Sequence, residues 1–317
     1  MDTIHSLEAR SLRKRYGSTD ALDGFDLSVQ AGTIHGLLGP NGAGKSTAVK
    51  GLSTLIDLDG GQAVVAGYDV ARQPGQVRRS IGLIGQNSAV DEVITGAENL
   101  IMFGRLFGLT KRSATARGVA LLEQFGLAEA ANRPVSTYSG GMRRRLDIAA
   151  GLILTPAVLF LDEPTTGLDP RARNEVWASV REVAGQGTTV LLTTQYLDEA
   201  DQLASMISVM DHGRVVAEGT PDALKRQLGG DRVVITLFEP DQVTTVAEAL
   251  GRLAGSSVIT DVETRTVTVE ASRSGSATLA DCVRALDATG IEAEDVILRR
   301  PTLDEVFLAL TEQEVTR

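Results

Sequence analysis

The sequence of 317 residues has one cysteine, Cys282, which excludes an intramolecular disulfide and makes a reducing cytosol the simplest location. Its first residues show no basic run followed by an apolar core, so no secretory signal is expected. Long apolar runs are also missing. The longest uncharged one, residues 148–161, has 14 residues and contains a proline, whereas a membrane-spanning helix needs about 20. We therefore expect a folded chain that does not itself cross a bilayer.

Basic residues are in deficit, because 31 Lys and Arg against 41 Asp and Glu give a net charge of −10. Residues 229–317 hold 16 acids and 8 bases, a net of −8, so residues 1–228 carry only −2. Proteins that bind nucleic acid normally present a basic face, and this balance argues against such a partner. The run Arg143, Arg144 and Arg145 is expected to be a solvated helix face.

The first two thirds of the chain alternate short β-branched runs with helical patterns, which is typical of an α/β domain. Strands are expected at residues 33–38, 158–161 and 188–193. A mostly helical stretch, about residues 95–154, opens with a capping box formed by Thr95 and Glu98. The sequence predicts a domain over residues 1–228, with a mixed sheet core and this stretch as a helical subdomain.

Residues 229–317 predict a second, smaller α+β domain. A short helix after Pro221 ends at Gly229 and Gly230, a plausible cap and linker. The order that follows is β-α-β-β-α-β, which is typical of a ferredoxin-like sandwich. The expected segments are strands at 233–238, 257–261, 264–270 and 295–298, and helices from 241, over 276–289 and from 302.

A glycine-rich loop carries the strongest chemical signal. Residues 39–46 fit the pattern G-x-x-x-x-G-K-[ST], and the loop lies between a predicted strand and a predicted helix. Backbone N–H groups of such a loop surround an anion, and the helix N-terminus adds partial positive charge. The loop alone does not distinguish a kinase, a GTPase and an ATPase. The expected nucleotide-binding residues are Gly39, Pro40, Asn41, Gly42, Ala43, Gly44, Lys45, Ser46 and Thr47.

A second acidic site follows the apolar strand at residues 158–161. Asp162 stands at the strand end and is suited to hold Mg²⁺ together with Ser46. Glu163 comes one residue later and is placed to polarise an attacking water. Lys45 is expected to reach the β- and γ-phosphates. No Asn-Lys-x-Asp element for guanine is found.

The segment Tyr138-Ser139-Gly140-Gly141-Met142 resembles the signature motif of ATP-binding-cassette (ABC) ATPases. Ser139 and the two glycines at a helix start form another anion-binding N-terminus. The resemblance covers essentially the whole chain. It implies that two cassettes pack head to tail, so that the signature motif of one chain closes over the nucleotide on the P-loop of the other.

The same resemblance implies further roles. Tyr16 would stack on adenine, Gln86 would ligate Mg²⁺ beside Ser46 and Asp162, and the loop Gly167-Leu168-Asp169 would cross the dimer interface.

Two positions depart from the general family pattern. Gln195 stands where the family usually has a histidine that holds the γ-phosphate, and Met142 replaces the usual glutamine. Gln195 can donate a hydrogen bond but carries no titratable charge. His5, His35 and His212 do not substitute for it by position, and all three are interpreted as structural. These departures, with residues 192–201 and 299–308, resemble the daunorubicin/doxorubicin-resistance subfamily of ABC exporters.

The resemblance implies a homodimeric ATPase that uses ATP and Mg²⁺, with Lys45, Glu163 and Gln195 as catalytic residues. It would drive a separate membrane permease, at the cytoplasmic face of the membrane, that exports a hydrophobic compound such as an anthracycline-like drug. Residues 87–108, which include Val90, Val93, Ile94 and Phe103, are either the permease docking surface or part of the domain's own core.

Two alternatives remain open from the sequence. One is a soluble ABC ATPase acting on ribosomes or nucleic acid, which the negative charge and the single P-loop oppose. The other is a nucleotide-binding regulatory module without useful turnover, which Gln195 suggests and the carboxylates of Asp162 and Glu163 oppose.

Overall fold

The computed structural model describes residues 5–227, 231–253, 258–270, 275–299, 302–303 and 305. The chain divides into two compact units, residues 1–221 and 222–317. The predicted division into domains at residue 228 stays a prediction. Among the described residues, no helix is both long and apolar enough to span a membrane.

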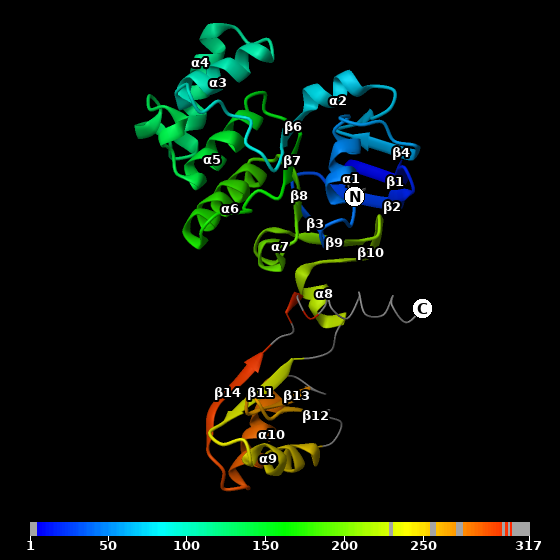
Figure 1. The fold of residues 1–317 in the computed structure, drawn as a ribbon, viewed down its shortest axis with the longest axis vertical. Coiled ribbons are helices and arrows are strands. Elements are labelled where there is room, and N and C mark those ends of the chain that lie inside the picture. The colour runs from blue at the N-terminus through cyan, green and yellow to red at the C-terminus, as the bar shows by residue number, and fades with distance from the viewer. Residues whose placement is uncertain are drawn as a thin grey trace. The chain divides into compact units, whose positions relative to one another are not determined.

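A six-stranded sheet forms the centre of the first unit (Figure 1). Its order is β10-β9-β3-β8-β7-β6, parallel except for the antiparallel edge strand β10. Strands β3, β7 and β8 are buried along their whole length, as is typical of parallel strands covered on both faces. The strands are β3 (Ile34–Leu38), β6 (Ile81–Ile84), β7 (Val158–Asp162), β8 (Thr189–Thr194), β9 (Met206–Asp211) and β10 (Arg214–Gly219).

An antiparallel sheet packs against one face of the central sheet. Its order is β2-β1-β4-β5. One hydrophobic cluster joins the two sheets, since Phe25 of β2 and Phe160 of β7 both belong to it and are fully buried. The elements here are β1 (His5–Tyr16), β2 (Thr19–Gln30), β4 (Gly60–Val65), β5 (Tyr68–Asp69), α1 (Lys45–Leu52) and α2 (Pro74–Ser80).

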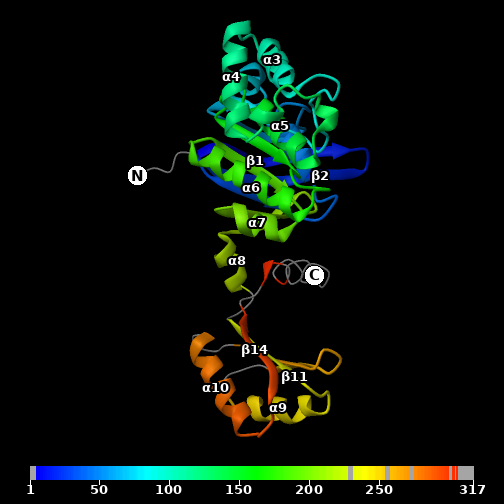
Figure 2. The same cartoon turned by 90° about the vertical axis from the view of Figure 1, so that its left-hand side faces the viewer.

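The helical subdomain lies on the other side of the central sheet, where α3, α4 and α5 gather (Figure 1). The turned view shows α5 beside α6, and α7 beside α6 (Figure 2). The predicted capping box is confirmed, because Thr95 and Glu98 satisfy each other's backbone N–H groups. The helices are α3 (Gly96–Leu106), α4 (Lys111–Gln124), α5 (Gly140–Gly151), α6 (Pro170–Gly185) and α7 (Leu197–Leu203), with short 3-10 turns at Ala128–Ala130 and Val135–Thr137.

The second unit carries the predicted ferredoxin-like order. Its antiparallel sheet has the order β12-β13-β11-β14, with a hydrophobic core that includes Cys282. Helix α8 (Pro221–Gln227) precedes it, while Gly229, Gly230 and most of the helix expected from Thr302 lie outside the described residues. The elements are β11 (Arg232–Leu237), α9 (Gln242–Gly251), β12 (Val258–Asp261), β13 (Thr266–Glu270), α10 (Gly275–Asp287) and β14 (Ala293–Arg299).

The three histidines occupy different environments. His5 begins β1 and His212 lies in the turn between β9 and β10. His35 is buried in β3, where its Nε2 lies 2.8 Å from Ser208 Oγ. Burial lowers the pKa of His35 to about 4. The neutral form is therefore the one that this strand accommodates.

The lowered pKa of His35 predicts that the folded chain loses stability in acid. Its pKa of about 4 in the folded chain lies below the unfolded value of about 6.5. The contribution of neutral His35 to the free energy of unfolding is therefore complete above about pH 6.5 and is lost as pH falls toward about 4. We expect His35→Gln, which cannot be protonated, to remove about 3 kcal/mol of this pH dependence. Urea unfolding between pH 7 and pH 4 measures the free energy of unfolding of the parent chain and of His35→Gln. Equal pH slopes in both would contradict the assignment.

Candidate nucleotide-binding site

The P-loop connects β3 to α1 and depends on glycine for its shape. Gly42 and Gly44 adopt left-handed backbone angles, with φ of 88° and 106°. A Cβ at Gly39 would lie 2.3 Å from the Met210 carbonyl oxygen, and a Cβ at Gly44 would lie 2.2 Å from the carbonyl oxygen of Ala21. Only glycine fits these approaches without displacing the neighbouring backbone. The predicted turn before α1 is therefore fixed by β2 and β9.

Lys45 is a buried cation at the start of α1, with 4% of its surface exposed. Its Nζ donates to the carbonyl oxygens of Gly39 at 2.7 Å and Pro40 at 2.9 Å, and lies 4.0 Å from Glu163 Oε1. Burial lowers the pKa of Lys45, while the charges of Glu163 and Asp162 oppose that shift. The ammonium group is thus held at the carboxyl ends of the parallel strands.

Asp162, at the end of β7, joins that strand to β8 and to helix α1. Its Oδ1 accepts hydrogen bonds from Ser46 Oγ at 3.2 Å and from Thr193 Oγ1. Hydroxyl and carboxylate oxygens are ligands that Mg²⁺ takes together with water and substrate phosphates, so Ser46 and Asp162 fit this ion. No group of three His, Cys, Asp or Glu suited to a metal occurs in the described part of the chain.

Glu163 leaves the sheet through an unusual backbone conformation. Its φ is 47°, although it is not glycine, and its N–H donates to the Thr193 carbonyl oxygen at 3.1 Å. Thr166 Oγ1 donates to Glu163 Oε2 at 3.3 Å. Non-glycine residues with left-handed backbone angles are uncommon, and those that occur are concentrated at functional sites. This turn directs the carboxylate toward Lys45.

Gln86 follows β6 and is exposed. A hollow of about 250 Å³ brings it together with Glu163 and with Gly140 at the start of α5. Ser88, Arg143, Arg144, Pro164, Thr166 and Leu168 complete its lining. The loop after β6, the end of β7 and the signature segment therefore border one space.

The signature residues begin α5. Ser139 is the N-cap, and its Oγ accepts from the Met142 N–H at 3.2 Å. A Cβ at Gly140 would lie 3.2 Å from Leu168 Cδ2, and a Cβ at Gly141 would lie 2.8 Å from the Ala172 Cβ. These glycines are therefore also required for close packing of α5 against α6 and the preceding loop. The Ser139 side chain is exposed.

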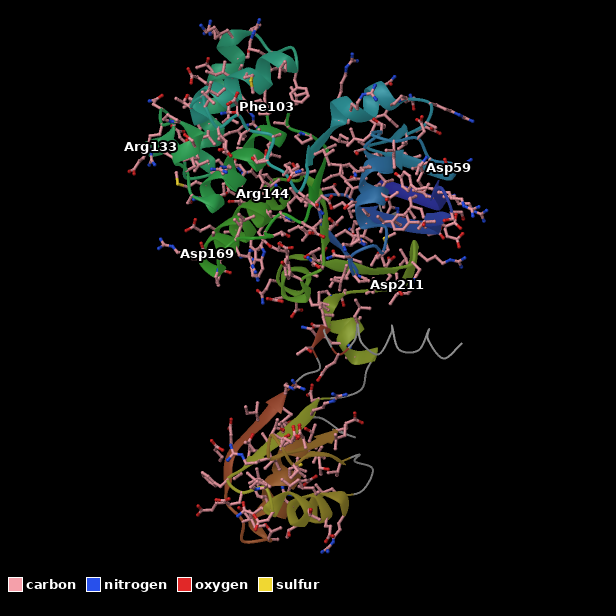
Figure 3. The ribbon with its side chains drawn as sticks, viewed as in Figure 1. Asp59, Phe103, Arg133, Arg144, Asp169 and Asp211 are labelled. Atoms are coloured by element: carbon pink, nitrogen blue, oxygen red, sulfur yellow. The ribbon has the colours of Figure 1, made fainter. Side chains whose placement is uncertain are left out.

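The interface loop predicted from the resemblance runs from β7 to α6. Gly167 has φ of 77°, and Asp169 caps α6 by accepting from the Ala172 N–H at 2.9 Å (Figure 3). Both residues are exposed, while Leu168 is half-buried.

Tyr16 and Gln195 keep their roles as predictions. Tyr16 ends β1 with 49% of its surface exposed, and Lys14 Nζ lies 5.6 Å from its ring centroid. Gln195 directly follows β8 and is half-buried. The next residue, Tyr196, stacks under the Arg173 guanidinium at 5.2 Å.

The prediction for Arg144 as a solvated residue is wrong. Arg144 is buried with 7% exposed, whereas its neighbours Arg143 and Arg145 are half-buried and pair with Glu92 and Glu175. Three consecutive residues of a helix point in different directions, so the run cannot form a single solvated face. Arg144 lies three residues after Gly141 and four before Ile148, both buried, so it falls on the inward stripe of α5.

Sequence reasoning also missed Glu199, which is fully buried in α7. Its Oε1 accepts from Thr165 Oγ1 at 2.7 Å and from Trp177 Nε1 at 3.0 Å, while Oε2 has no hydrogen-bond partner among the described residues. Burial raises the pKa of Glu199. The helix after Gln195 is thereby joined to the loop after Glu163.

Comparison with known proteins gives one consistent result. A family model described as ABC transporter matches residues 22–166. The daunorubicin resistance ATP-binding protein DrrA2 of Streptomyces coeruleorubidus is 57% identical, over 97% of this chain and 95% of that protein. The daunorubicin/doxorubicin resistance ATP-binding protein DrrA of Streptomyces peucetius is 49% identical, over 96% and 92% respectively.

Solved structures agree on the fold of the first unit. The ATP-binding subunit of an ABC transporter has a TM-score of 0.62 and 30% identity, covering 70% of this chain and 92% of that structure. A dimeric ATP-binding cassette with bound ADP and phosphate has a TM-score of 0.61, covering 68% of this chain and 98% of that one; at 22% identity it supports the fold alone.

The P-loop geometry predicts a contrast between two glycines. A Cβ at Gly42 meets nothing within 4 Å, so Gly42→Ala should cost about 1–2 kcal/mol from the left-handed backbone alone. Gly44→Ala should cost about 3–4 kcal/mol, because overlap with the Ala21 carbonyl adds to that strain. Urea unfolding without nucleotide measures both. Equal losses would show that the close approach at Gly44 does not constrain the loop.

Proposed function

This chain belongs to the ABC transporter family and is one of its ATPases, and we propose that it is the ATP-hydrolysing subunit of an exporter whose permease is a separate chain. The observation that carries this proposal is the meeting of Lys45, Asp162 and Glu163 at one sheet edge, with Ser46 hydrogen-bonded to Asp162. The comparisons offer no support for a ribosomal or nucleic-acid role.

Binding of ATP would use the P-loop. Backbone N–H groups of residues 39–47 would receive the phosphates, Lys45 would contact the β- and γ-phosphates, and Tyr16 would stack on adenine. Mg²⁺, held by Ser46, Asp162 and Gln86, would neutralise charge that develops on the phosphate oxygens.

Hydrolysis would depend on positioning. Glu163 Oε1 lies 4.0 Å from Lys45 Nζ, and its left-handed backbone fixes the carboxylate where an attacking water can be oriented. Gln195 would donate a hydrogen bond to the γ-phosphate without a change of charge. The hollow beside Gln86 would allow this water to approach.

We further propose that two copies of this chain enclose two ATP molecules. Ser139 and Gly140 are exposed at the N-terminus of α5, where an anion is favoured. Their partner would be the γ-phosphate on the P-loop of the second copy. The loop of Gly167, Leu168 and Asp169, exposed at Gly167 and Asp169, would lie between the two sites.

The permease would dock at an apolar groove. Leu55, Phe103, Phe107, Ile153 and Leu154 help to line a hollow of about 220 Å³ between α3 and the end of α5. Leu55 and Phe107 are 60% and 53% exposed. Phe103 is labelled in Figure 3.

The expected docking segment is only partly accessible. Val90 packs in the core, so it cannot contribute, while Val93 is 83% exposed. An amphipathic segment on the cytoplasmic side of a permease fits a groove of this kind. This interaction would hold the subunit at the cytoplasmic face of the membrane.

The transported compound is proposed from the relatives. Proteins named for daunorubicin and doxorubicin resistance match this chain over more than nine tenths of its length. A hydrophobic drug of the anthracycline type, or another antibiotic, is therefore the proposed substrate class. Uptake of doxorubicin into inverted vesicles that contain this chain and its permease tests that proposal.

Replacement of the water-orienting group should stop turnover and retain nucleotide. We expect Glu163→Gln to lower the ATPase rate by about 10²–10⁴-fold, while ATP and Mg²⁺ convert the variant to a dimer. Steady-state phosphate release and light scattering after size exclusion measure the two effects. A variant that remains monomeric at millimolar ATP would contradict the two-copy mechanism.

The groove gives a separate prediction. Phe107→Ser should lower co-purification of the chain with its membrane permease at least about fivefold. An aromatic side chain that becomes buried in an interface contributes strongly to binding. Val119→Ser is the matched control, since Val119 is 50% exposed on α4 and does not line the groove. Melting temperatures confirm folding of both. Equal loss in the two variants would reject the groove as the docking site.

A further inference from the structure

The guanidinium of Arg144 donates to three backbone carbonyl oxygens in two segments that carry different parts of the nucleotide site. Nη1 donates to the Gly85 carbonyl oxygen at 2.8 Å, and Nε donates to that of Pro164 at 2.8 Å. Nη2 donates to the carbonyl oxygen of Asp162 at 3.4 Å. Arg144 itself belongs to α5, and Figure 3 labels its side chain in the interior of the first unit.

Each contacted segment lies beside a functional side chain. Gly85 directly precedes Gln86, and the carbonyls of Asp162 and Pro164 flank Glu163 on both sides. The helix that supplies Arg144 begins at the Ser139 cap. One side chain therefore joins the groups expected at a chain's own ATP to the motif expected at the ATP of the other copy.

Asp147 completes this cluster. Its Oδ2 lies 3.2 Å from Arg144 Nη1, and its Oδ1 accepts from the Ala89 N–H at 3.0 Å. Asp147 is 3% exposed, so the ion pair is almost fully buried. The pair thus fixes the loop that contains Gln86 to α5 on both sides, at Gly85 and at Ala89.

Burying such a pair for stability alone is a poor solution. The desolvation of two charges offsets most of their attraction, and apolar replacements of similar volume are often as stable. Arginine nevertheless suits this position, because its planar group offers five donors in fixed directions to several carbonyl oxygens. Lysine has three donors around a single nitrogen and cannot reach all three of these separated carbonyl oxygens.

We propose that Arg144 is a positioning residue that couples the two composite nucleotide sites of the dimer. Arg144 keeps Gln86 and Glu163, which face one ATP, in a fixed position relative to Ser139. Ser139 faces the other ATP. This proposal rests on the proposed function, since it requires two copies that share two ATP molecules. Nothing in it requires Arg144 to touch nucleotide.

Loss of the Arg144 contacts should leave ATP binding by one chain intact and remove the coupling between the two ATP sites. Without the Arg144 contacts, the P-loop still has its glycines and Lys45, so one chain alone still binds ATP. The polar link between the signature helix and the segment at Glu163 is then lost. Closure of one site no longer favours closure of the second, which abolishes cooperativity between them.

The test compares Arg144→Lys with a matched control on the same helix. Arg145→Lys is that control, because Arg145 contacts the Phe125 carbonyl oxygen and Glu175 instead of the nucleotide segments. Three quantities are measured on the full chain. They are trinitrophenyl-ATP affinity of the monomer, the Hill coefficient of ATP hydrolysis, and ATP-dependent dimerisation in a Glu163→Gln background.

For Arg144→Lys we expect nucleotide affinity within about twofold of the parent chain, a Hill coefficient near 1, and dimerisation weakened about tenfold. Arg145→Lys should keep all three values. Equal cooperativity and dimerisation in the two variants would overturn the proposal. A loss of monomer affinity as large as the loss of dimerisation would also overturn it, because it would show a purely structural role.

Two further results separate the possible failures. If Arg144→Lys does not fold, Asp147→Asn takes its place, since it removes the charge beside Nη1 and leaves an acceptor for the Ala89 N–H. It should weaken dimerisation about threefold at unchanged monomer affinity, and no change would reject the proposal. A parent chain with Glu163→Gln that never dimerises with ATP would instead refute the proposed function, and the coupling with it.

Discussion

The site depends on one buried cation held among oxygen atoms. Lys45 Nζ contacts two P-loop carbonyls and approaches Glu163, at an exposed fraction of 4%. A lone ammonium group in this place would be costly, so the carboxylates of Glu163 and Asp162 must lie nearby. Their positions follow from β7, which is buried along its length and ends at Asp162. The order of the parallel strands thus determines where the proposed phosphate chemistry would take place.

The remaining machinery is attached to this edge through polar contacts that cross the first unit. Arg144 connects the signature helix to the ends of β6 and β7, and Glu199 connects α7 to Thr165. Each buried charge has specific donors or acceptors, although Glu199 leaves one oxygen without a hydrogen-bond partner among the described residues. This combination explains why loops far apart in sequence, at Gln86 and Gln195, are fixed relative to one sheet edge. Their proposed roles in catalysis follow from that placement.

The sequence was sufficient for features with strong local rules. The P-loop pattern, the apolar strands and the Thr95 capping box all appear in the structure, because backbone geometry and burial demand those residue types. The sequence was insufficient where tertiary packing decides whether a residue is buried or exposed. Arg144 belonged to a charged run, yet helix phase turned it inward. The left-handed conformation of Glu163 has no sequence signal, and Val90 entered the core instead of a docking surface.

The central claim is that each ATP is enclosed by two copies of this chain, with Ser139 of one facing the P-loop of the other. The most direct measurement is a crystal or cryo-EM structure of the Glu163→Gln chain with ATP and Mg²⁺. The account predicts Ser139 Oγ within hydrogen-bond distance of the γ-phosphate on the partner copy. Nucleotide bound with its γ-phosphate open to solvent, and Ser139 far from any nucleotide in the assembled complex, would contradict it.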